Sequence, residues 1–163
     1  MIFVTLGTQD KPFKRLIRAV EKQIELGNIT EKVIVQSGCT KYTSKQENMK
    51  IIDYMPIEDF NKYLEDAQIL ITHAGVGTIL QALDKNKIII AAARKRVYGE
   101  HVNNHQEQIL DNFSNEGYIL PLKSFRKLNE VIDKAKDFKP KKFEKNNEKF
   151  IENLENEITN LFN

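Results

Sequence analysis

The chain has 163 residues, of which 40% are hydrophobic and 29% are charged, a composition typical of ordinary globular domains rather than disordered or fibrous chains. Its formal net charge of +2 is too small to predict nucleic-acid binding, and its single cysteine, Cys39, excludes an internal disulfide. The amino-terminal residues lack the regions of a signal peptide, and no apolar run approaches the ~20 residues that span a bilayer. We therefore expect a cytoplasmic chain.

Six short segments rich in β-branched residues predict strands. They alternate with helical patterns, so we expect an α/β fold with a Rossmann-like parallel sheet and helices on both faces. Most of the segments are apolar throughout, as strands covered on both faces must be. They lie at residues 2–6, 32–36, 50–54, 68–72, 88–92 and 118–120.

Apolar residues at helical spacing predict five helices between and after these strands, at residues 13–24, 57–64, 79–83, 109–113 and 128–135. Asp10 is the expected N-cap of the first helix, with Pro12 in its first turn. The polar segment 37–48 predicts a mobile loop. We expect the ligand-binding domain to occupy residues 1–140, and an amphipathic helix to follow at 141–163.

The basic residues are unevenly distributed. Residues 123–149 contain ten Lys or Arg and five Asp or Glu, whereas residues 1–122 contain fifteen of each. This excess favours a solvated helix face over a contact with an anionic membrane.

Ligands of open α/β sheets bind beyond the carboxyl ends of the strands, so the turns that follow strands are the first candidates. The first strand is followed by Gly7-Thr8-Gln9. Here a glycine lets backbone N–H groups approach an anion, and Thr8 adds a hydroxyl donor. Taken alone, this turn favours the alternative, a glycine that is needed only for a tight turn from strand to helix.

The fourth strand leads into His73-Ala74-Gly75-Val76-Gly77-Thr78, which opens a helix. The free N–H groups and the positive dipole end of that helix predict a binding site for a diphosphate. The alternative is that the two glycines permit close helix packing and that His73 is a structural histidine.

A third turn follows the fifth strand and is dense in polar groups. Arg94, Lys95 and Arg96 could neutralise phosphates, and the other side chains could hydrogen-bond sugar hydroxyls. These others are Glu100, Asn104, His105 and Gln106. The alternative interpretation is a solvated polar loop.

Other chemistries have weaker support. Gly75-Val76-Gly77 resembles the start of a dinucleotide-binding fingerprint, but Leu80 replaces its third glycine. Arg94 stands where the fingerprint expects an acidic residue that binds the ribose. An NADP-binding oxidoreductase is therefore the weakest alternative. His101 and His105 lie four residues apart without a third ligand, so we predict no metal. No motif for covalent catalysis is visible.

Taken in order, the turns at 7–9, 73–79 and 100–106 resemble the signature of a glycosyltransferase group related to the C-terminal, donor-binding half of MurG. The resemblance runs from Met1 to about Leu120. Within that group the chain resembles bacterial PssE-like proteins of exopolysaccharide and capsule synthesis. More distantly, it resembles the catalytic subunit of the dolichol-linked N-acetylglucosaminyltransferase.

This resemblance implies one half of a GT-B enzyme that binds a UDP-sugar. A separate PssD-like, membrane-anchored subunit would supply the acceptor side and hold the chain at the inner face of the cell membrane. The C-terminal helix would join the two subunits through an apolar stripe; the alternative is that it packs on its own sheet. The stripe comprises Phe150, Ile151, Leu154, Ile158 and Leu161.

The resemblance also implies roles for single residues. Gly7 and Thr8 would face the diphosphate, and the turn from Gly75 to Thr78 would hold the phosphates. His105 and Gln106 would contact the donor sugar. Gln81 stands where related enzymes usually carry a Glu that faces the ribose hydroxyls. The candidates for the general base are Glu100, His73 or a residue of the partner.

The expected activity is therefore inverting transfer of a hexose or N-acetylhexosamine, foremost galactose or N-acetylglucosamine, from UDP to a lipid-linked saccharide. Fixed N–H donors together with Arg or Lys would stabilise the departing UDP without a metal or other cofactor. An alternative from another class is a non-catalytic accessory subunit that enhances a partner glycosyltransferase.

Overall fold

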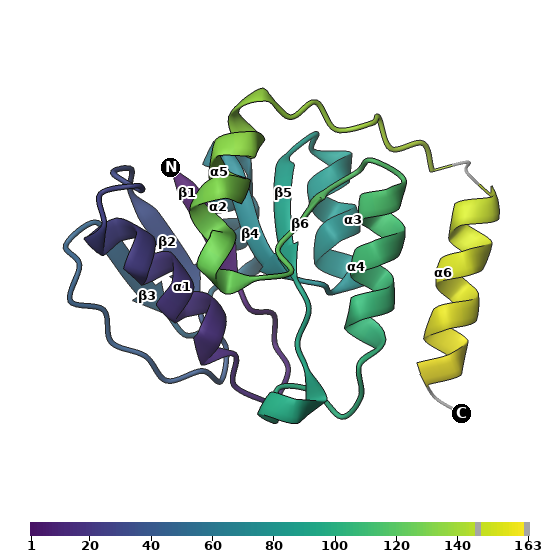
Figure 1. Ribbon diagram of the computed structural model, residues 1–163, viewed down its shortest axis with the longest axis horizontal. Helices are drawn as coiled ribbons and strands as arrows, with labels where there is room; N and C mark the ends of the chain where they lie inside the picture. Colours follow the sequence, from purple (N-terminus) through teal and green to yellow (C-terminus); the bar gives the residue numbers. More distant parts are fainter. Residues whose placement is uncertain (146–147, 162–163) are drawn as a thin grey trace.

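The computed structural model of the protein describes residues 1–145 and 148–161; the side chains of residues 148, 151 and 157–161 lie outside that description. Within these residues, one parallel sheet has the strand order β3-β2-β1-β4-β5-β6 (Figure 1). The strands are β1 (Ile2–Thr5), β2 (Val33–Gln36), β3 (Met49–Ile52), β4 (Ile69–His73), β5 (Ile88–Ala92) and β6 (Leu120–Pro121). The chain begins in the middle of the sheet, builds one edge, and returns to pair β4 with β1. The predicted Rossmann-like fold is confirmed.

Helices cover both faces of the sheet (Figure 1). They are α1 (Lys14–Glu25), α2 (Ile57–Asp66), α3 (Val76–Asp84), α4 (His105–Asn115), α5 (Leu128–Asp137) and α6 (Glu148–Leu161), with short 3-10 helices η1 (Arg96–Tyr98) and η2 (Phe125–Lys127). Successive side chains of a strand point to opposite faces. Val4 therefore packs with α1 and α5, whereas Phe3 packs with α2, α3 and α4.

The start of α1 differs from the prediction. The helix begins at Lys14 after Phe13, and no side chain caps it, so the expected N-cap Asp10 is wrong. Phe13 is fully buried, and its N–H donates to Thr40 Oγ1 at 2.9 Å. A distant loop thus satisfies the donor at the beginning of α1.

The segment 37–48 is anchored, in contrast to the predicted mobile loop. Glu21 of α1 accepts hydrogen bonds from the Tyr42 hydroxyl, from Ser44 Oγ at 2.6 Å and from Lys45 N at 3.0 Å. At the start of the segment, Ser37 Oγ donates to Asp53 Oδ1 at 3.2 Å. The polar composition of the loop is therefore used for contacts with its own fold.

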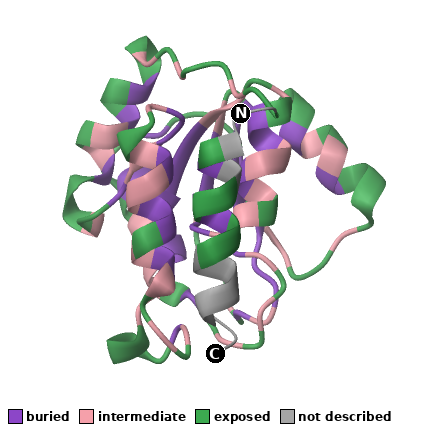
Figure 2. Cartoon of the chain, turned by 90° about the vertical axis from the view of Figure 1, so that its right-hand side faces the viewer, coloured by how far each residue is buried: buried purple, intermediate pink, exposed green. Residues whose placement is uncertain are grey.

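The terminal helix α6 packs on α4 at the side of the domain (Figures 1 and 2). Phe150 and Leu154 are buried, and the Phe150 ring centroid lies 5.0 Å from that of Phe113 and 5.3 Å from that of Tyr118. These two residues of the predicted docking stripe are thus occupied within the chain itself, as the alternative expected. The side chains of the other three, Ile151, Ile158 and Leu161, lie outside the described part of the structure.

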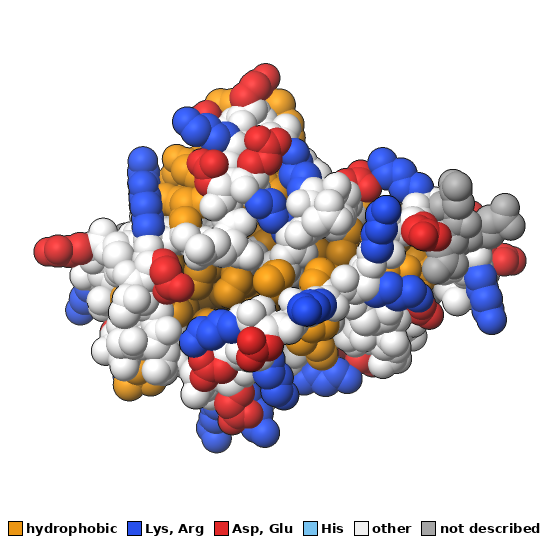
Figure 3. Space-filling view, turned by 90° about the horizontal axis from the view of Figure 1, so that it is seen from above, with side chains coloured by type: hydrophobic (Ala, Val, Ile, Leu, Met, Phe, Trp, Pro, Cys, Tyr) orange, Lys and Arg blue, Asp and Glu red, His pale blue; other side chains and the backbone are white. Residues whose placement is uncertain are grey.

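The late basic segment does not form a surface of one sign. Lys141 pairs with Glu116 at 3.5 Å, and Lys145 pairs with Asp84 at 3.0 Å. Figure 3, which looks onto the amino ends of the strands, shows charged side chains of both signs around central hydrophobic ones. In the described ranges, no helix combines the length and apolarity that crossing a membrane would require.

Candidate functional site

A pocket of about 370 Å³ lies at the carboxyl ends of β1 and β4, where the order of strands along the chain reverses. Such a switch point is the usual ligand site of an open α/β sheet. The pocket is lined by Thr5, Gly7, Thr8, Gln9, Gln36, Met55, Ile57, Phe60, His73, Gly75, Gly77, Thr78 and Gln81. The lining includes no Asp, Glu, Lys or Arg, and His73 is its one titratable side chain.

A second hollow of about 180 Å³ adjoins the first, because Gln9 and Gly75 line both. The second hollow is lined by Gln9, Ala74, Gly75, Val76, His101, His105, Gln106 and Ile109. The structure thus gathers the predicted residues of all three turns around two connected spaces. Arg94, Glu100 and Asn104 are not among the lining residues.

The His73 imidazole lies against the backbone of Gly7 and of Gly75, and its position explains both glycines. A Cβ on Gly7 would lie 2.6 Å from His73 Cε1, and a Cβ on Gly75 would lie 2.2 Å from His73 Nε2. Gly7 also has φ of +73°, which L residues rarely adopt. Both glycines therefore make room for the imidazole, a role that the sequence did not reveal.

The His73 imidazole is neutral at physiological pH. Burial lowers its pKa to about 4, and the positive charge of Arg94 acts in the same direction. A base this weak accepts a proton poorly from an acceptor hydroxyl. The geometry therefore favours a neutral, hydrogen-bonding histidine at the floor of the pocket over a general base.

Gly77 differs from the other two glycines of the site. A Cβ at this position would meet no heavy atom within 4 Å, so the fold itself does not require a glycine. Gly77 is the second residue of α3 and lines the first pocket. An unneeded glycine inside a helix costs about 0.5–1 kcal/mol relative to alanine, which suggests that the space beside it serves a ligand.

The amino end of α3 supplies hydrogen-bond donors at the same place. Its N-cap, Gly75, makes no side-chain capping bond. The N–H groups of the first turn, residues 76–78, have no acceptor within the helix. An anion bound at this end would meet these N–H groups with the positive end of the helix dipole behind them.

Neutral polar side chains complete the first pocket. Thr5 Oγ1 donates to Gln36 Oε1 at 2.7 Å, which fixes two residues at the ends of β1 and β2. Gln81 Nε2 donates to Asn61 Oδ1 at 2.6 Å, so the Gln81 carbonyl oxygen remains as an acceptor for a ligand hydroxyl. Thr5 and Gln36 were missed by the sequence analysis, which considered turns after strands and overlooked polar residues that end apolar strands.

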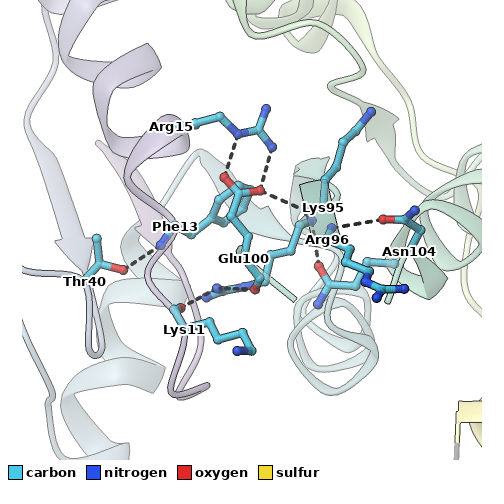
Figure 4. Close-up of polar contacts among 10 residues, drawn as sticks. Lys11, Phe13, Arg15, Thr40, Lys95, Arg96, Glu100 and Asn104 are labelled. Carbon is cyan, nitrogen blue, oxygen red and sulfur yellow. Dashed lines mark hydrogen bonds and ion pairs between the residues drawn. The ribbon is translucent and has the colours of Figure 1, made fainter. Parts of the chain in front are cut away.

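Glu100, a candidate for the general base, is buried in an ion pair (Figure 4). Its carboxylate accepts from Arg15 Nε at 2.6 Å, from Arg15 Nη2 at 2.7 Å and from Lys95 N at 3.0 Å. Donors occupy both oxygens of this carboxylate, which leaves it little access to a substrate proton. The structure thus gives Glu100 a structural position instead of a place in the pocket.

Arg94 is also turned away from the pocket, with 1% of its surface exposed. Its guanidinium donates to Lys11 O and Leu6 O, both at 2.6 Å. Its backbone N–H donates to Gln106 Oε1 at 3.0 Å. Nearby, Asn104 Oδ1 accepts from Arg96 N at 3.0 Å. Residues 94–106 therefore form a loop organised by internal hydrogen bonds, in which Arg94 is buried away from the position of a phosphate while Arg96 and Asn104 remain exposed.

Comparison with known proteins places this geometry in a family. Residues 1–161 match the model of the glycosyltransferase family 28 C-terminal domain. The UDP-N-acetylglucosamine transferase subunit ALG13 of Candida albicans is 26% identical over 99 residues, which cover 61% of this chain and 32% of the relative. Its counterpart from Saccharomyces cerevisiae is 31% identical over 91 residues, which cover 53% of this chain and 43% of the relative. The chain thus matches less than half the length of these curated relatives.

Solved structures share the fold. The NMR solution structure of ALG13 superposes with a TM-score of 0.59 at 22% identity and covers 94% of this chain and 93% of its own. The crystal structure of the glycosyltransferase SnogD from Streptomyces nogalater gives a TM-score of 0.52 at 19% identity and covers 83% of this chain but only 38% of its own. The six-stranded domain therefore shares its fold with one part of the longer SnogD chain.

Proposed function

This chain belongs to the glycosyltransferase family 28 C-terminal domain family, and we propose that it is the donor-binding subunit of a UDP-sugar glycosyltransferase. The observation that carries the proposal is Gly77, a glycine without a structural reason, at the uncapped amino end of α3 in the largest hollow of the switch point. Family membership favours glycosyl transfer over the NADP-binding oxidoreductase that the sequence left open.

The chemistry follows from the donors around the two hollows. The diphosphate would lie against the N–H groups of residues 76–78, and Gln81 would accept from a ribose hydroxyl. His105 and Gln106 in the second hollow would contact the sugar. As the bond between the sugar C1 and the diphosphate oxygen breaks, the fixed donors would stabilise the negative charge on UDP, and this role needs no metal or other cofactor.

The acceptor oxygen would attack C1 with inversion, and its proton must pass to a general base. The Glu100 carboxylate is bound by Arg15, and the pKa of His73 is lowered to about 4, mainly by burial, so neither side chain is suited to accept this proton. We therefore assign the base to a partner chain and give His73 the role of a neutral hydrogen-bonding group beside the diphosphate. This revises the two candidates that the sequence suggested.

Exposed apolar side chains support a partner at this edge. Of the exposed large hydrophobic residues whose side chains the structure describes, five follow the carboxyl ends of β3 and β5, and one, Leu26, follows α1. The five are Tyr54, Ile57, Val97, Tyr98 and Val102, with 57–79% of their surface exposed. Burying such side chains against another protein is favourable. The partner would be a PssD-like, membrane-anchored subunit that supplies the acceptor side.

With that partner, the acceptor would be a lipid-linked saccharide at the inner face of the cell membrane. The donor would carry a hexose or N-acetylhexosamine, with galactose or N-acetylglucosamine foremost, for exopolysaccharide or capsule synthesis. The relatives are subunits of a UDP-N-acetylglucosamine transferase, which supports both a UDP-linked donor and a heteromeric enzyme.

The test is isothermal titration calorimetry of the full chain with UDP, with Gly77→Ala as the variant. A methyl group at position 77 would occupy the space of the diphosphate, so we expect UDP affinity to fall at least about tenfold, while alanine in a helix raises stability by about 0.5–1 kcal/mol. Asn129→Ala, at the second position of α5, is the matched control and should leave UDP affinity unchanged. Equal UDP affinity of the wild type and Gly77→Ala would refute the assigned site.

A second assay separates catalysis from the accessory role. The complex with the partner is assembled with the wild type or with Gly77→Ala, and transfer from a UDP-sugar is followed. Loss of turnover in an assembled complex would support donor binding by this chain. Unchanged turnover would favour the non-catalytic accessory subunit instead.

A further inference from the structure

Arg94 is a buried cation at the start of the loop 94–106, which contributes residues to the second hollow. Arg94 itself lines neither hollow. We propose that Arg94 is a positioning residue that joins the loops on both sides of the site and places a fixed positive charge behind them, so that the site discriminates in favour of anionic ligands. The proposal rests on the proposed function, because it concerns how the same site recognises a nucleoside diphosphate.

Arg94 connects two loops that are far apart in the sequence. Its guanidinium donates to Leu6 O at 2.6 Å and to Lys11 O at 2.6 Å, both in the loop after β1, and to Glu100 O at 3.3 Å in the loop after β5. Leu6 directly precedes Gly7, which lines the first pocket. A single side chain thus fixes the separation of the two loops.

The backbone of Arg94 acts on the second hollow. Its N–H donates to Gln106 Oε1 at 3.0 Å, and Gln106 is a lining residue with 4% of its surface exposed. This bond uses the Gln106 carbonyl oxygen and leaves its NH₂ group as the donor toward the hollow. The orientation suits an anionic or hydroxyl-bearing ligand.

The charge of Arg94 is only partly compensated. All the acceptors that its guanidinium meets are backbone carbonyl oxygens, whereas the nearby Glu100 carboxylate is bound by Arg15 and by Lys95 N. Within the described residues, Arg94 Nε is a buried nitrogen without a hydrogen-bond partner. The ring of Phe13, 5.0 Å from the guanidinium carbon, adds a weak cation–π contact.

A buried charge without a paired carboxylate is unfavourable for the free protein. Its cost falls when an anion binds nearby, so the arrangement favours a charged ligand over a neutral one. The charge of Arg94 acts on a histidine in each hollow. Burial is the largest cause that lowers the pKa of His73 in the first hollow and of His101 in the second, and the positive charge of Arg94 lowers both further.

The experiment compares UDP with uridine, which lacks the diphosphate. Calorimetry on the full chain gives the ratio of the two affinities for the wild type, Arg94→Gln and Arg94→Lys. Gln retains a donor without charge, and Lys retains the charge with fewer donors. We expect the UDP/uridine ratio to fall on the order of tenfold in Arg94→Gln, as for one charge near the anion at intermediate dielectric. The ratio should be largely retained in Arg94→Lys.

A neutral control removes the neighbouring ion pair. The double variant Arg15→Met with Glu100→Gln removes both charges of that pair and leaves the net charge of the protein unchanged. It should keep the UDP/uridine ratio within about twofold. If Arg94→Gln weakens UDP and uridine equally, or if the double variant lowers the ratio as much as Arg94→Gln does, Arg94 is only a structural clamp and the proposal is wrong.

NMR titration of the His101 ring provides a measurement that needs no nucleotide. Removing the positive charge in Arg94→Gln should raise the pKa of His101, whereas Arg94→Lys should leave it close to the wild type. An unchanged His101 titration in Arg94→Gln would contradict the electrostatic role. If the wild type itself binds no UDP, the proposed function fails, while the titration still decides whether the charge of Arg94 reaches the hollow.

Discussion

At the scale of residues, two glycines of the site are tied to one imidazole. Gly75 has φ of −86° and ψ of 122°, an extended conformation that any residue adopts. Only the 2.2 Å approach of a Cβ to His73 Nε2 therefore opposes a side chain there. Gly7 differs, because its φ of +73° adds backbone strain to the same steric conflict.

This difference predicts a double-mutant cycle. Gly75→Ala should lower the free energy of unfolding by about 1–3 kcal/mol, because the methyl group must displace a buried ring. In a His73→Ala background the same change should cost less than about 0.5 kcal/mol, since the conflicting atoms are gone. Urea denaturation of the four proteins measures both values.

Gly7→Ala serves as the control of that cycle. Its cost should persist in the His73→Ala background at about 1 kcal/mol, the strain of an alanine at positive φ. If His73→Ala relieved neither glycine substitution, the imidazole would not be the reason for the glycine at position 75.

His73 also predicts a dependence of stability on pH. Its folded-state pKa of about 4 lies below the value of 6.5 expected for an unfolded histidine. Between these values the unfolded chain binds a proton that the folded chain does not, so stability falls as pH decreases from 6.5 to 4. Integration gives a loss of roughly 2 kcal/mol between pH 7 and pH 5.

The measurement is urea denaturation at pH 7 and pH 5 for the wild type and for His73→Gln, which cannot titrate. The pKa of His101 is also lowered, mainly by burial, but His101 is present in both proteins, so its contribution to the loss of stability cancels in the comparison. The wild type should lose about 2 kcal/mol more than the variant. Parallel losses in the two proteins would show that His73 is protonated as readily in the folded state as in the unfolded state.

At the scale of elements, Glu21 fastens the loop of residues 37–48 to α1. Burial would raise the pKa of Glu21, but hydrogen bonds from Ser44, Tyr42 and the Lys45 backbone outweigh it and lower the pKa. The other side of this contact is Tyr42, whose pKa rises to about 12 through burial and the bond to Glu21. One carboxylate thus anchors the middle of the loop.

Removing the carboxylate should release the loop without unfolding the sheet. We expect trypsin to cleave Glu21→Ala after Lys41 or Lys45 about tenfold faster than the wild type, since local opening exposes the backbone. Glu25→Ala, which loses only a surface pair with Lys22, is the matched control. Equal cleavage rates for Glu21→Ala and Glu25→Ala would show that other contacts hold the loop.

The helix α6 contributes to the core through Phe150. Its ring packs edge-on against Phe113, Tyr118 and Phe143. Phe150→Ala should therefore lower the stability of the isolated chain by about 3 kcal/mol. Glu152→Ala, on the exposed side of the same helix, should change it by less than about 0.5 kcal/mol. Calorimetric unfolding of the isolated chain measures both values. If Phe150→Ala left the stability unchanged, Phe150 would be available for the docking to a partner that the sequence suggested.

The sequence predicted the strands because short β-branched runs are apolar throughout, and it predicted the helices because apolar residues recur at helical spacing. The strand predicted at residues 88–92 has the same bounds as β5, Ile88–Ala92, and the predicted fold class is confirmed. Failures occur where a distant segment replaces a local signal. The donor of Phe13 is satisfied by Thr40 instead of by a capping Asp10, and the loop after β2 is fastened by Glu21. Such contacts have no periodicity in the chain.

The site shows the same division. The glycine turns were evident because their composition departs from that of the surrounding elements. Arg94 and Glu100 were assigned to ligands because charges in a turn usually face solvent, whereas the structure turns both into the fold. No local pattern announces that Arg94 donates to Leu6 and Lys11, more than eighty residues earlier in the chain.

At the scale of the whole molecule, the two ends of the sheet have different surfaces. The amino ends of the strands carry interspersed charges of both signs (Figure 3). The carboxyl ends carry the two hollows and, among the side chains that the structure describes, most of the exposed large hydrophobic ones, with η1 projecting beyond them (Figure 1). A chain whose apolar surface is gathered around its candidate site is suited to work against another protein.

Charged substitutions on η1 and its loop test this arrangement. Val97 and Val102 are 79% and 67% exposed and line neither hollow. We expect Val97→Lys with Val102→Lys to weaken association with the acceptor-side subunit by at least about a hundredfold, because two lysines would be buried in an apolar contact. UDP affinity of the isolated chain should remain within about twofold, since the donor site lies beside these residues and does not include them.

Surface plasmon resonance with the immobilised partner measures the first value, and calorimetry measures the second. Leu26→Lys is the matched control, because Leu26 is also exposed, at 59%, but lies at the end of α1 away from the hollows. Weaker association for the η1 variant alone would place the partner over the donor site, where it can supply the missing base. If Leu26→Lys weakened association and the η1 variant did not, the partner would bind the α1 side, and the base would have to be sought within this chain.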